Sequence, residues 1–232
     1  TPLINQTPDE HVRGFSLVST DEGALGLQAE HRPEWKPVSA DWLSSEMKRR
    51  ISGGRKQLLS RAVGLRAKPE ARILDVTGGL GRDAFTLAAL GANITLLERQ
   101  PMVVALLRDA QQRARNCTDA AMELSADRVC IIGTDAIDFD VPPDEYDAIY
   151  MDPMYPSHGR RSLPQKEMQL LRELAGDDID ADELLRYLLP KAPRVAVKRP
   201  AKAPCLAGIE PDVVLRGTQA RYDIYLQRKV PE

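Results

Sequence analysis

Cysteine and histidine, the residues that build disulfide frameworks and many metal centres, are scarce in this sequence. Three of each occur among its 232 residues, and both types are widely scattered. The cysteines, Cys117, Cys130 and Cys205, are odd in number and fit neither a disulfide framework nor a zinc site, which indicates a reducing cytoplasm. We therefore expect no metal and no His-based catalytic triad.

Long apolar runs and a strong net charge are also missing. No apolar run approaches the roughly 20 residues that span a bilayer. The first residues have no signal-peptide pattern, because polar residues and prolines interrupt them. With a net charge of −2, any nucleic-acid binding must come from local basic patches. A hydrophobic content of 43% and a charged content of 28% are typical of a soluble globular protein.

Strands and helices alternate from position 72 onward. Short apolar runs predict strands at 72–76, 93–98, 129–133, 146–151, 194–198, 212–215 and 222–226. Helices are predicted at 84–90, 101–115, within 164–175 and at 182–189. Such alternation predicts an α/β fold, in which right-handed crossovers build a parallel sheet. The last two strands, joined by a short turn, close it as an antiparallel pair.

The first part of the chain gives a weaker pattern. Short strands at 14–18 and 24–28, between turns, predict a small β-rich appendage over residues 1–45, followed by a main domain over 46–232. Five cations then surround Gly53-Gly54, within residues 48–56. This basic stretch is either a solvated loop or a mobile clamp for phosphates, because glycines permit close approach and cations supply charge. An amphipathic helix at 57–63 leads into the main domain.

A glycine-rich loop, residues 77–83, follows the strand at 72–76 and opens a helix. Its backbone N–H groups and the helix N-terminus face a ligand. The segment from Gly79 to Ala84 fits the dinucleotide pattern G-x-G-x-x-A, although such a turn also serves as a tight connection. Glu98 ends the next strand, 23 positions after Asp75, where a carboxylate can accept hydrogen bonds from both ribose hydroxyls. A solvated strand-end acid is the plainer interpretation of Glu98.

Two features favour S-adenosylmethionine over NAD. Asp75 lies just before the glycines of the loop, and Arg82-Asp83 lie just after them. A carboxylate here can hold the amino group of a methionine moiety, but it would repel a pyrophosphate. Thr134-Asp135 closes the third strand, where an acid or hydroxyl can accept from the adenine N6 amine. Each residue alone could be a cap or turn residue. Together they favour a methyltransferase, with a nicotinamide-dependent oxidoreductase as the alternative.

The strand at 146–151 ends in Asp152-Pro153-Met154-Tyr155. Pro153 cannot continue a ladder, so a carboxylate, a backbone carbonyl and an aromatic face meet at the strand's C-terminal end. Ligands bind at that edge of open α/β sheets. The two acceptors suit an amino group on a planar base, which the ring can stack against. A simple Asp-Pro turn with a buried tyrosine is the alternative, and the motif does not distinguish guanine N2 from adenine N6 or a glutamine amide.

Six sequence blocks together resemble the ribosomal RNA small subunit methyltransferase J family. The likeness extends over about residues 47–227, and its blocks fall in the right order: Lys48–Gly54, Asp75–Phe85, Leu97–Leu107, Asp152–Pro156, Val197–Pro200 and Arg221–Tyr225. The overall layout resembles a Rossmann-like class I methyltransferase with strand order 3-2-1-4-5-7-6. The family resemblance implies S-adenosylmethionine-dependent methylation of a guanine N2 in 16S rRNA.

The resemblance also implies residue roles. Cofactor contacts are implied at Arg82, Asp83, Glu98, Arg99, Thr134, Asp135 and Asp152, and the loop argument adds Asp75, Gly78, Gly79 and Gly81. The family commonly has two hydroxyl residues in place of Thr134-Asp135 and, at the motif's aromatic, phenylalanine in place of Tyr155. As catalytic residues, Asp152 and Pro153 would accept from the guanine amine while Tyr155 stacks on the base, without a metal or a covalent enzyme intermediate.

Basic side chains are the expected contacts to 16S rRNA or the small subunit. The candidates are Arg49, Arg50, Arg55, Lys56, Arg160, Arg161, Lys198 and Arg199. The last two are expected to leave the fifth strand on the same edge as the pocket. Each of these cations could instead be an ordinary solvated side chain, and a non-catalytic RNA-binding module is a further alternative.

Overall fold

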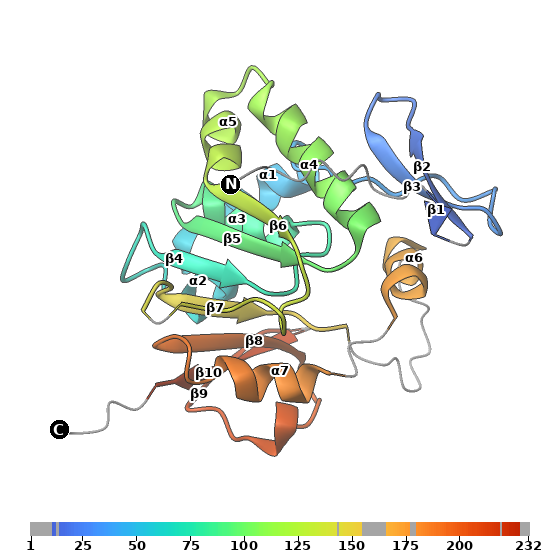
Figure 1. Cartoon of the computed structure of the whole chain (residues 1–232). Helices are drawn as coiled ribbons and strands as arrows, with labels where there is room; N and C mark the ends of the chain where they lie inside the picture. The colour runs from blue at the N-terminus through green and yellow to red at the C-terminus, as the bar shows by residue number, and fades with distance from the viewer. Residues whose placement is uncertain are drawn as a thin grey trace.

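The fold is built on a seven-stranded mixed sheet (Figure 1). The computed structural model describes residues 11–12, 14–142, 144–154, 166–176, 180–218 and 220–227. The strands of this sheet are β4 (Arg72–Asp75), β5 (Asn93–Glu98), β6 (Val129–Gly133), β7 (Ala148–Met151), β8 (Arg194–Pro200), β9 (Val213–Arg216) and β10 (Ala220–Leu226). Their spatial order is β6-β5-β4-β7-β8-β10-β9, which confirms the expected order 3-2-1-4-5-7-6. Five strands run parallel, and β10 pairs antiparallel with both β8 and β9.

Helices cover both faces of the sheet because successive strand residues point to opposite sides. Ile73 belongs to one buried cluster and its neighbour Leu74 to the other. The first cluster includes residues of α1 (Ser45–Ser52), α2 (Leu58–Ala62), α3 (Arg82–Ala89), α4 (Pro101–Arg115), α5 (Ala120–Asp127) and α6 (Lys166–Ala175). The second includes residues of α7 (Ala181–Leu188) and the 3₁₀ turn η2 (Leu206–Gly208).

A separate antiparallel sheet precedes the large one. It contains β1 (His11–Val12), β2 (Phe15–Ser19) and β3 (Leu25–Ala29), which confirms the two strands expected in this region. Figure 1 shows it beside α4, and the backbone N–H of Leu25 donates to Asp109 Oδ2 of that helix at 3.2 Å. Trp42, which follows this sheet in the chain, is fully buried and stacks on Phe85 with ring centroids 4.7 Å apart. The small sheet and Trp42 therefore pack against the core of the main domain.

Three local expectations were wrong or incomplete. The basic stretch is not a loop: it is the end of α1 and the 3₁₀ turn η1 (Gly54–Lys56), because Ser44 caps the helix by accepting from Met47 N at 3.2 Å. Helix α5 was not expected, although the side chain of Asp119 caps it. Strand β8 continues to Pro200, two residues further than predicted, because β10 pairs with it along that length.

Candidate functional site

One cavity of about 290 Å³ lies at the C-terminal ends of the parallel strands. Parallel strands bring their carboxyl ends to one edge, so residues far apart in sequence meet there. The cavity is lined by the residues expected from sequence to hold a cofactor or to act on an amine: Asp75, Gly78, Gly79, Gly81, Arg82, Asp83, Glu98, Arg99, Thr134, Asp135, Asp152 and Pro153. The structure thus brings these predicted residues together at one cavity.

The glycine loop packs so tightly on its neighbours that two of its positions exclude a side chain. A Cβ at Gly78 would lie 2.5 Å from Leu96 Cδ2 and 2.8 Å from the carbonyl oxygen of Leu97. Gly81, the N-cap of α3, has a φ of 71°, and its Cβ would lie 2.8 Å from Trp42 Cζ2. These glycines let the loop backbone form the wall of the cavity.

Glu98 is fixed at the end of β5 by two backbone donors. Its Oε2 accepts from Gly79 N and its Oε1 accepts from Gln100 N, both at 2.8 Å. A carboxylate oxygen has two lone pairs, so each oxygen can accept a further hydrogen bond. The two backbone donors therefore fix the orientation of the Glu98 carboxylate at the cavity.

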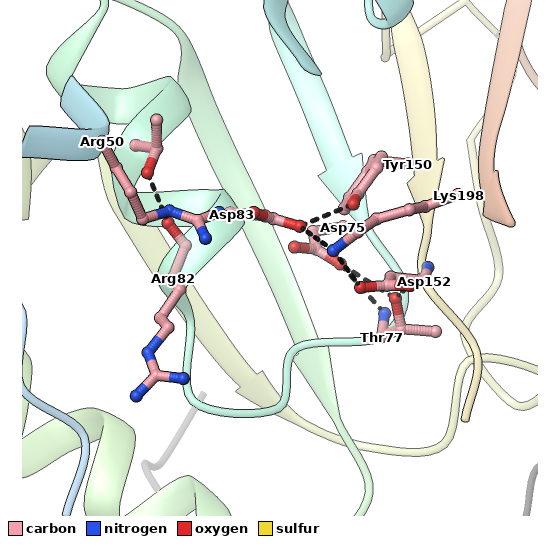
Figure 2. Close-up of polar contacts among 9 residues, drawn as sticks. Arg50, Asp75, Thr77, Arg82, Asp83, Tyr150, Asp152 and Lys198 are labelled. Carbon is pink, nitrogen blue, oxygen red and sulfur yellow. Dashed lines mark hydrogen bonds and ion pairs between the residues drawn. The ribbon is translucent and has the colours of Figure 1, made fainter. Parts of the chain in front are cut away.

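Asp83 is the centre of a charged network on the cavity wall (Figure 2). Its Oδ2 accepts from the Tyr150 hydroxyl at 2.6 Å and from Lys198 Nζ at 3.2 Å, and its Oδ1 accepts from Arg50 Nη2. Burial opposes its ionisation, but the charges of Lys198 and Arg50 outweigh that effect and lower the pKa of Asp83 below its usual value. Asp83 is thus held as a carboxylate.

Asp152 accepts a shorter hydrogen bond from the same lysine. Lys198 Nζ donates to Asp152 Oδ2 at 2.7 Å. Burial and the nearby Asp83 raise the pKa of Asp152, although Lys198 counteracts the rise. Burial would lower the pKa of Lys198, but the two carboxylates raise it above its usual value, so the lysine is an ammonium.

Thr77 connects the glycine loop to the Asp-Pro motif. Its hydroxyl accepts from the backbone N–H of Asp152 at 2.7 Å, while its own backbone N–H donates to Asp75 Oδ1 at 3.0 Å. Asp75 is only 2% exposed, and its burial, with smaller contributions from Asp83 and Asp152, raises its pKa to about 7. The loop and the motif are therefore held in one fixed geometry, with a buried acid between them.

Two arginines of the site pair with elements on its outer side. Arg82 forms a bidentate pair with Glu167 of α6, with N–O distances of 2.8 and 2.7 Å. Arg99 Nη1 lies 3.3 Å from Asp180 Oδ2 and 3.7 Å from Asp135 Oδ2. These pairs position α6 and the start of α7 against the cavity, and Glu167 and Asp180 line it without having been expected from sequence. No local signal in the sequence marks these two acids.

Three of the cations predicted to contact RNA do not lie on an exposed rim of the sheet. Arg199 is only 4% exposed and donates to the carbonyl oxygen of Pro204 at 2.6 Å, so it does not form the expected basic rim. The reason is that β8 continues through Arg199, whose side chain therefore points away from that of Lys198. Lys198 and Arg50 face the cavity, contrary to expectation. A charged residue ending the apolar run of β8 was the available signal for Lys198.

The remaining predicted positions fall into two groups. Arg49, Arg55 and Lys56 are exposed, and Arg55 Nε donates to the carbonyl oxygen of Leu90 at 2.8 Å. Three predicted residues lie outside the described residues: Tyr155, Arg160 and Arg161.

The charge of the cavity suits a cationic ligand. Seven carboxyl side chains and four basic side chains line it. S-Adenosylmethionine, with a sulfonium and an ammonium group, fits this excess of acid, whereas the pyrophosphate of NAD would be repelled. Within the described ranges, no three His, Cys, Asp or Glu side chains are grouped to hold a metal ion. In the same ranges, no helix has the length and apolar character to cross a membrane.

Comparison with known proteins agrees with this chemistry. Residues 4–227 match the family described as "Putative SAM-dependent methyltransferase". The ribosomal RNA small subunit methyltransferase J of Marinobacter nauticus is 41% identical over 229 residues, covering 96% of this chain and 82% of the relative. The protein of the same name from Coxiella burnetii is 43% identical, covering 97% and 87%.

A solved structure is similar over nearly the whole chain. It is a SAM-dependent methyltransferase from Neisseria gonorrhoeae, 29% identical, with a TM-score of 0.70 and coverage of 96% of this chain and 86% of that one. These matches confirm the class I methyltransferase fold and the S-adenosylmethionine cofactor, and they give no support to a nicotinamide-dependent oxidoreductase. The chain belongs to the ribosomal RNA small subunit methyltransferase J family of S-adenosylmethionine-dependent methyltransferases.

Proposed function

We propose that the protein methylates the exocyclic N2 amine of a guanine in 16S rRNA, acting on the RNA or the small ribosomal subunit in the cytoplasm. The observation that supports this most is the position of Asp152 and Pro153: both line the cavity that also contains the glycine loop and Glu98. An acceptor pair for a planar amine is therefore next to the proposed site of the methyl donor. The names of the relatives supply the RNA substrate class.

Three parts of the cofactor have proposed partners among the residues of the cavity. We assign the ribose hydroxyls to Glu98, the adenine amine to Thr134 and Asp135, and the methionine amino group to Asp75. When bound, S-adenosylmethionine supplies an electrophilic methyl group carried by a sulfonium. Asp75 suits this role because a cation beside it would favour the ionised form that burial disfavours.

The Asp-Pro motif activates and orients the amine. The N2 lone pair of guanine is delocalised into the ring, so N2 is a weak nucleophile. Hydrogen bonds from N2 to the Asp152 carboxylate and the Pro153 carbonyl raise the electron density on N2 and orient its lone pair. Orientation of this kind supplies much of the rate of a transfer between bound groups. Asp152, whose pKa burial raises, is placed to accept the proton that N2 loses.

The base must leave its helical stack or be unpaired to enter such a cavity. We propose that Tyr155 stacks on it, a contact worth on the order of 1–3 kcal/mol in comparable cases. The exposed cations Arg49, Arg55 and Lys56 at α1 and η1 are proposed to contact phosphates, together with Arg160 and Arg161.

We also propose that residues 1–45 are an appendage to the methyltransferase domain, residues 46–232. Its three strands form their own sheet and make no ladder with the large one. Phe15, Leu27 and Trp42 are nevertheless buried in the shared core. Removing residues 1–45 is therefore expected to destabilise the domain, measured by its urea midpoint; an unchanged midpoint would contradict this packing.

Substitution of Asp152 tests the proposed role directly. With labelled cofactor and small subunits that lack the mark, Asp152→Ala should lose transfer by at least about 100-fold, because removing one oriented catalytic group typically costs that much. Asp140→Ala is the matched control, because the Asp140 side chain is 98% exposed and is not among the residues that line the cavity. Circular dichroism confirms that the variant is folded. Full activity of the folded Asp152→Ala protein would refute the assignment.

A further inference from the structure

Lys198 and Asp152 present their charged groups side by side in the cavity (Figure 2). They come from adjacent parallel strands: Met151 of β7 pairs with Val197 of β8, so the following residues are neighbours across the sheet. Their side chains meet with Lys198 Nζ 2.7 Å from Asp152 Oδ2. The sheet register thus fixes an ammonium next to a carboxylate at the place proposed for the amine.

Together these two groups offer two acceptors followed by a donor. The carboxylate of Asp152 has two acceptor oxygens, and the ammonium of Lys198 is a donor only. The Watson–Crick edge of guanine carries the complementary series, with N2–H and N1–H as donors and O6 as acceptor. Cytosine uses the same series of acceptor, acceptor and donor to pair with guanine. The Asp152–Lys198 pair therefore imitates the edge of cytosine.

Other planar amines fit this arrangement less well. Adenine has an acceptor nitrogen, N1, next to its amino group, and this lone pair would face the second oxygen of Asp152. Cytosine has N3 in the equivalent place. A glutamine amide has a donor and an acceptor, and uses only two of the three groups. An enzyme that binds a flipped-out base recognises it by hydrogen bonds to this edge.

Asp83 keeps other hydrogen-bond donors if Lys198 turns toward the base. The contact between Lys198 Nζ and Asp83 Oδ2, at 3.2 Å, is longer than the one to Asp152. Asp83 also accepts from the Tyr150 hydroxyl at 2.6 Å and from Arg50. Both donors stay in place when an N–H of Lys198 is directed at the base.

We propose that Lys198 is a specificity-determining residue that donates to O6 of the guanine, while Asp152 accepts from N1 and N2. This inference rests on the proposed guanine-N2 activity and deepens it. A lysine that only neutralised Asp83 and Asp152 would support the reaction on any planar amine. A lysine that contacts O6 selects the base, so a comparison of two bases separates the two roles.

The test compares guanine with 2-aminopurine at the modified position of otherwise identical reconstituted small subunits. 2-Aminopurine keeps the amine but lacks O6 and the N1 proton. The ratio of kcat/KM for guanine to that for 2-aminopurine is measured for the wild-type protein, for Lys198→Met and for Lys202→Met. Lys202 is the matched control because it is exposed, follows the same strand and lies outside the cavity lining.

We expect the wild-type ratio to be large and Lys198→Met to reduce it by about 10-fold or more, the factor expected for one hydrogen bond from a charged donor. Lys202→Met should leave the ratio unchanged, even if it weakens RNA binding. Lys198→Arg, which keeps N–H donors, should recover most of the preference. Calorimetry with S-adenosylhomocysteine verifies that each variant is folded.

Equal losses on both bases in Lys198→Met, with the ratio unchanged, would overturn the inference. So would a wild-type protein that methylates 2-aminopurine as well as guanine, a result that does not depend on any variant folding. Failure of the proposed function has a different signature: the wild-type protein would produce no N2-methylguanine from the guanine substrate.

Discussion

Asp75 makes the stability of the cofactor-free protein depend on pH in an unusual direction. Its carboxyl group is buried at the end of β4 and accepts from the backbone N–H of Thr77 at 3.0 Å. Burial raises its pKa from 3.8 to about 7. The folded protein therefore retains the Asp75 proton up to a much higher pH than the unfolded chain does.

The size of the effect follows from linkage. A shift of roughly three units, at about 1.36 kcal/mol per unit, sets a ceiling of about 4 kcal/mol. Because the folded-state pKa is raised, this stability is fully present below the unfolded pKa of 3.8 and is lost as the pH rises toward 7. An asparagine cannot ionise, so Asp75→Asn lacks this loss. The unfolding free energy of the variant minus that of wild type should therefore increase by about 2–3 kcal/mol from pH 5 to pH 8.

Urea unfolding of both proteins at the two pH values measures this gain. Other titrating groups are common to both proteins and largely cancel in the comparison. Asp140→Asn, at a side chain that is 98% exposed, is the control and should show no such gain. A difference between wild type and Asp75→Asn that is the same at pH 5 and pH 8 would refute the argument.

The same substitution links the buried acid to cofactor binding. If Asp75 holds the amino group of the methionine moiety, Asp75→Asn should bind S-adenosylhomocysteine at least about 10-fold more weakly at pH 8, because a charged hydrogen bond is lost. Calorimetry measures the affinity. Equal affinities for the two proteins would show that the amino group is bound elsewhere.

Three further predictions concern the glycine loop, the hydrogen bond from Trp42 to that loop, and the protonation of Asp152. Gly78→Ala should cost about 1–3 kcal/mol of unfolding free energy because its Cβ collides with β5. Gly79→Ala has room for its Cβ but a φ of 51°, and should cost about 1–2 kcal/mol. A urea titration that found Gly79→Ala far more destabilising than Gly78→Ala would contradict this. Trp42→Phe should cost about 1–3 kcal/mol in the same assay, because it removes the 3.0 Å hydrogen bond to the buried Leu80 carbonyl, and an unchanged midpoint would argue against that bond. The kcat/KM for methyl transfer should rise with pH through the raised pKa of Asp152 and then level off; a profile that falls over that range would contradict its role as a carboxylate acceptor.

The positions of the parallel strands were predictable from sequence because each strand is covered on both faces, whereas their order was expected from the resemblance to class I methyltransferases. Strands of that kind are short apolar runs. Ile73 and Leu74, neighbours in β4, are buried in the clusters on opposite faces of the sheet. Helix α5 escaped prediction because it is short and only weakly amphipathic, and the capping role of Asp119 is visible only once the helix is known. The basic stretch was predicted as a loop because Gly53-Gly54 signals a break, although the break follows a capped helix.

The meeting of Asp75, Glu98 and Asp152 at one cavity was predictable for a different reason. Loops at the ends of parallel strands meet at one edge, so the positions of Asp75, Glu98 and Asp152 follow from topology alone. The pairing of Arg50 and Lys198 with Asp83 could not be predicted in this way. It depends on how α1 packs against α3 and on the register of β8, which no local pattern encodes.

The central claim is that Asp152 and Pro153 accept hydrogen bonds from the N2 amine of a guanine in 16S rRNA, while Lys198 contacts O6 of the same base. The most direct measurement is mass spectrometry of the nucleosides released from 16S rRNA after incubation of the wild-type protein with labelled S-adenosylmethionine and small subunits that lack the mark. The predicted result is labelled N2-methylguanosine as the product. Label found only on another base, or on protein, would contradict the claim.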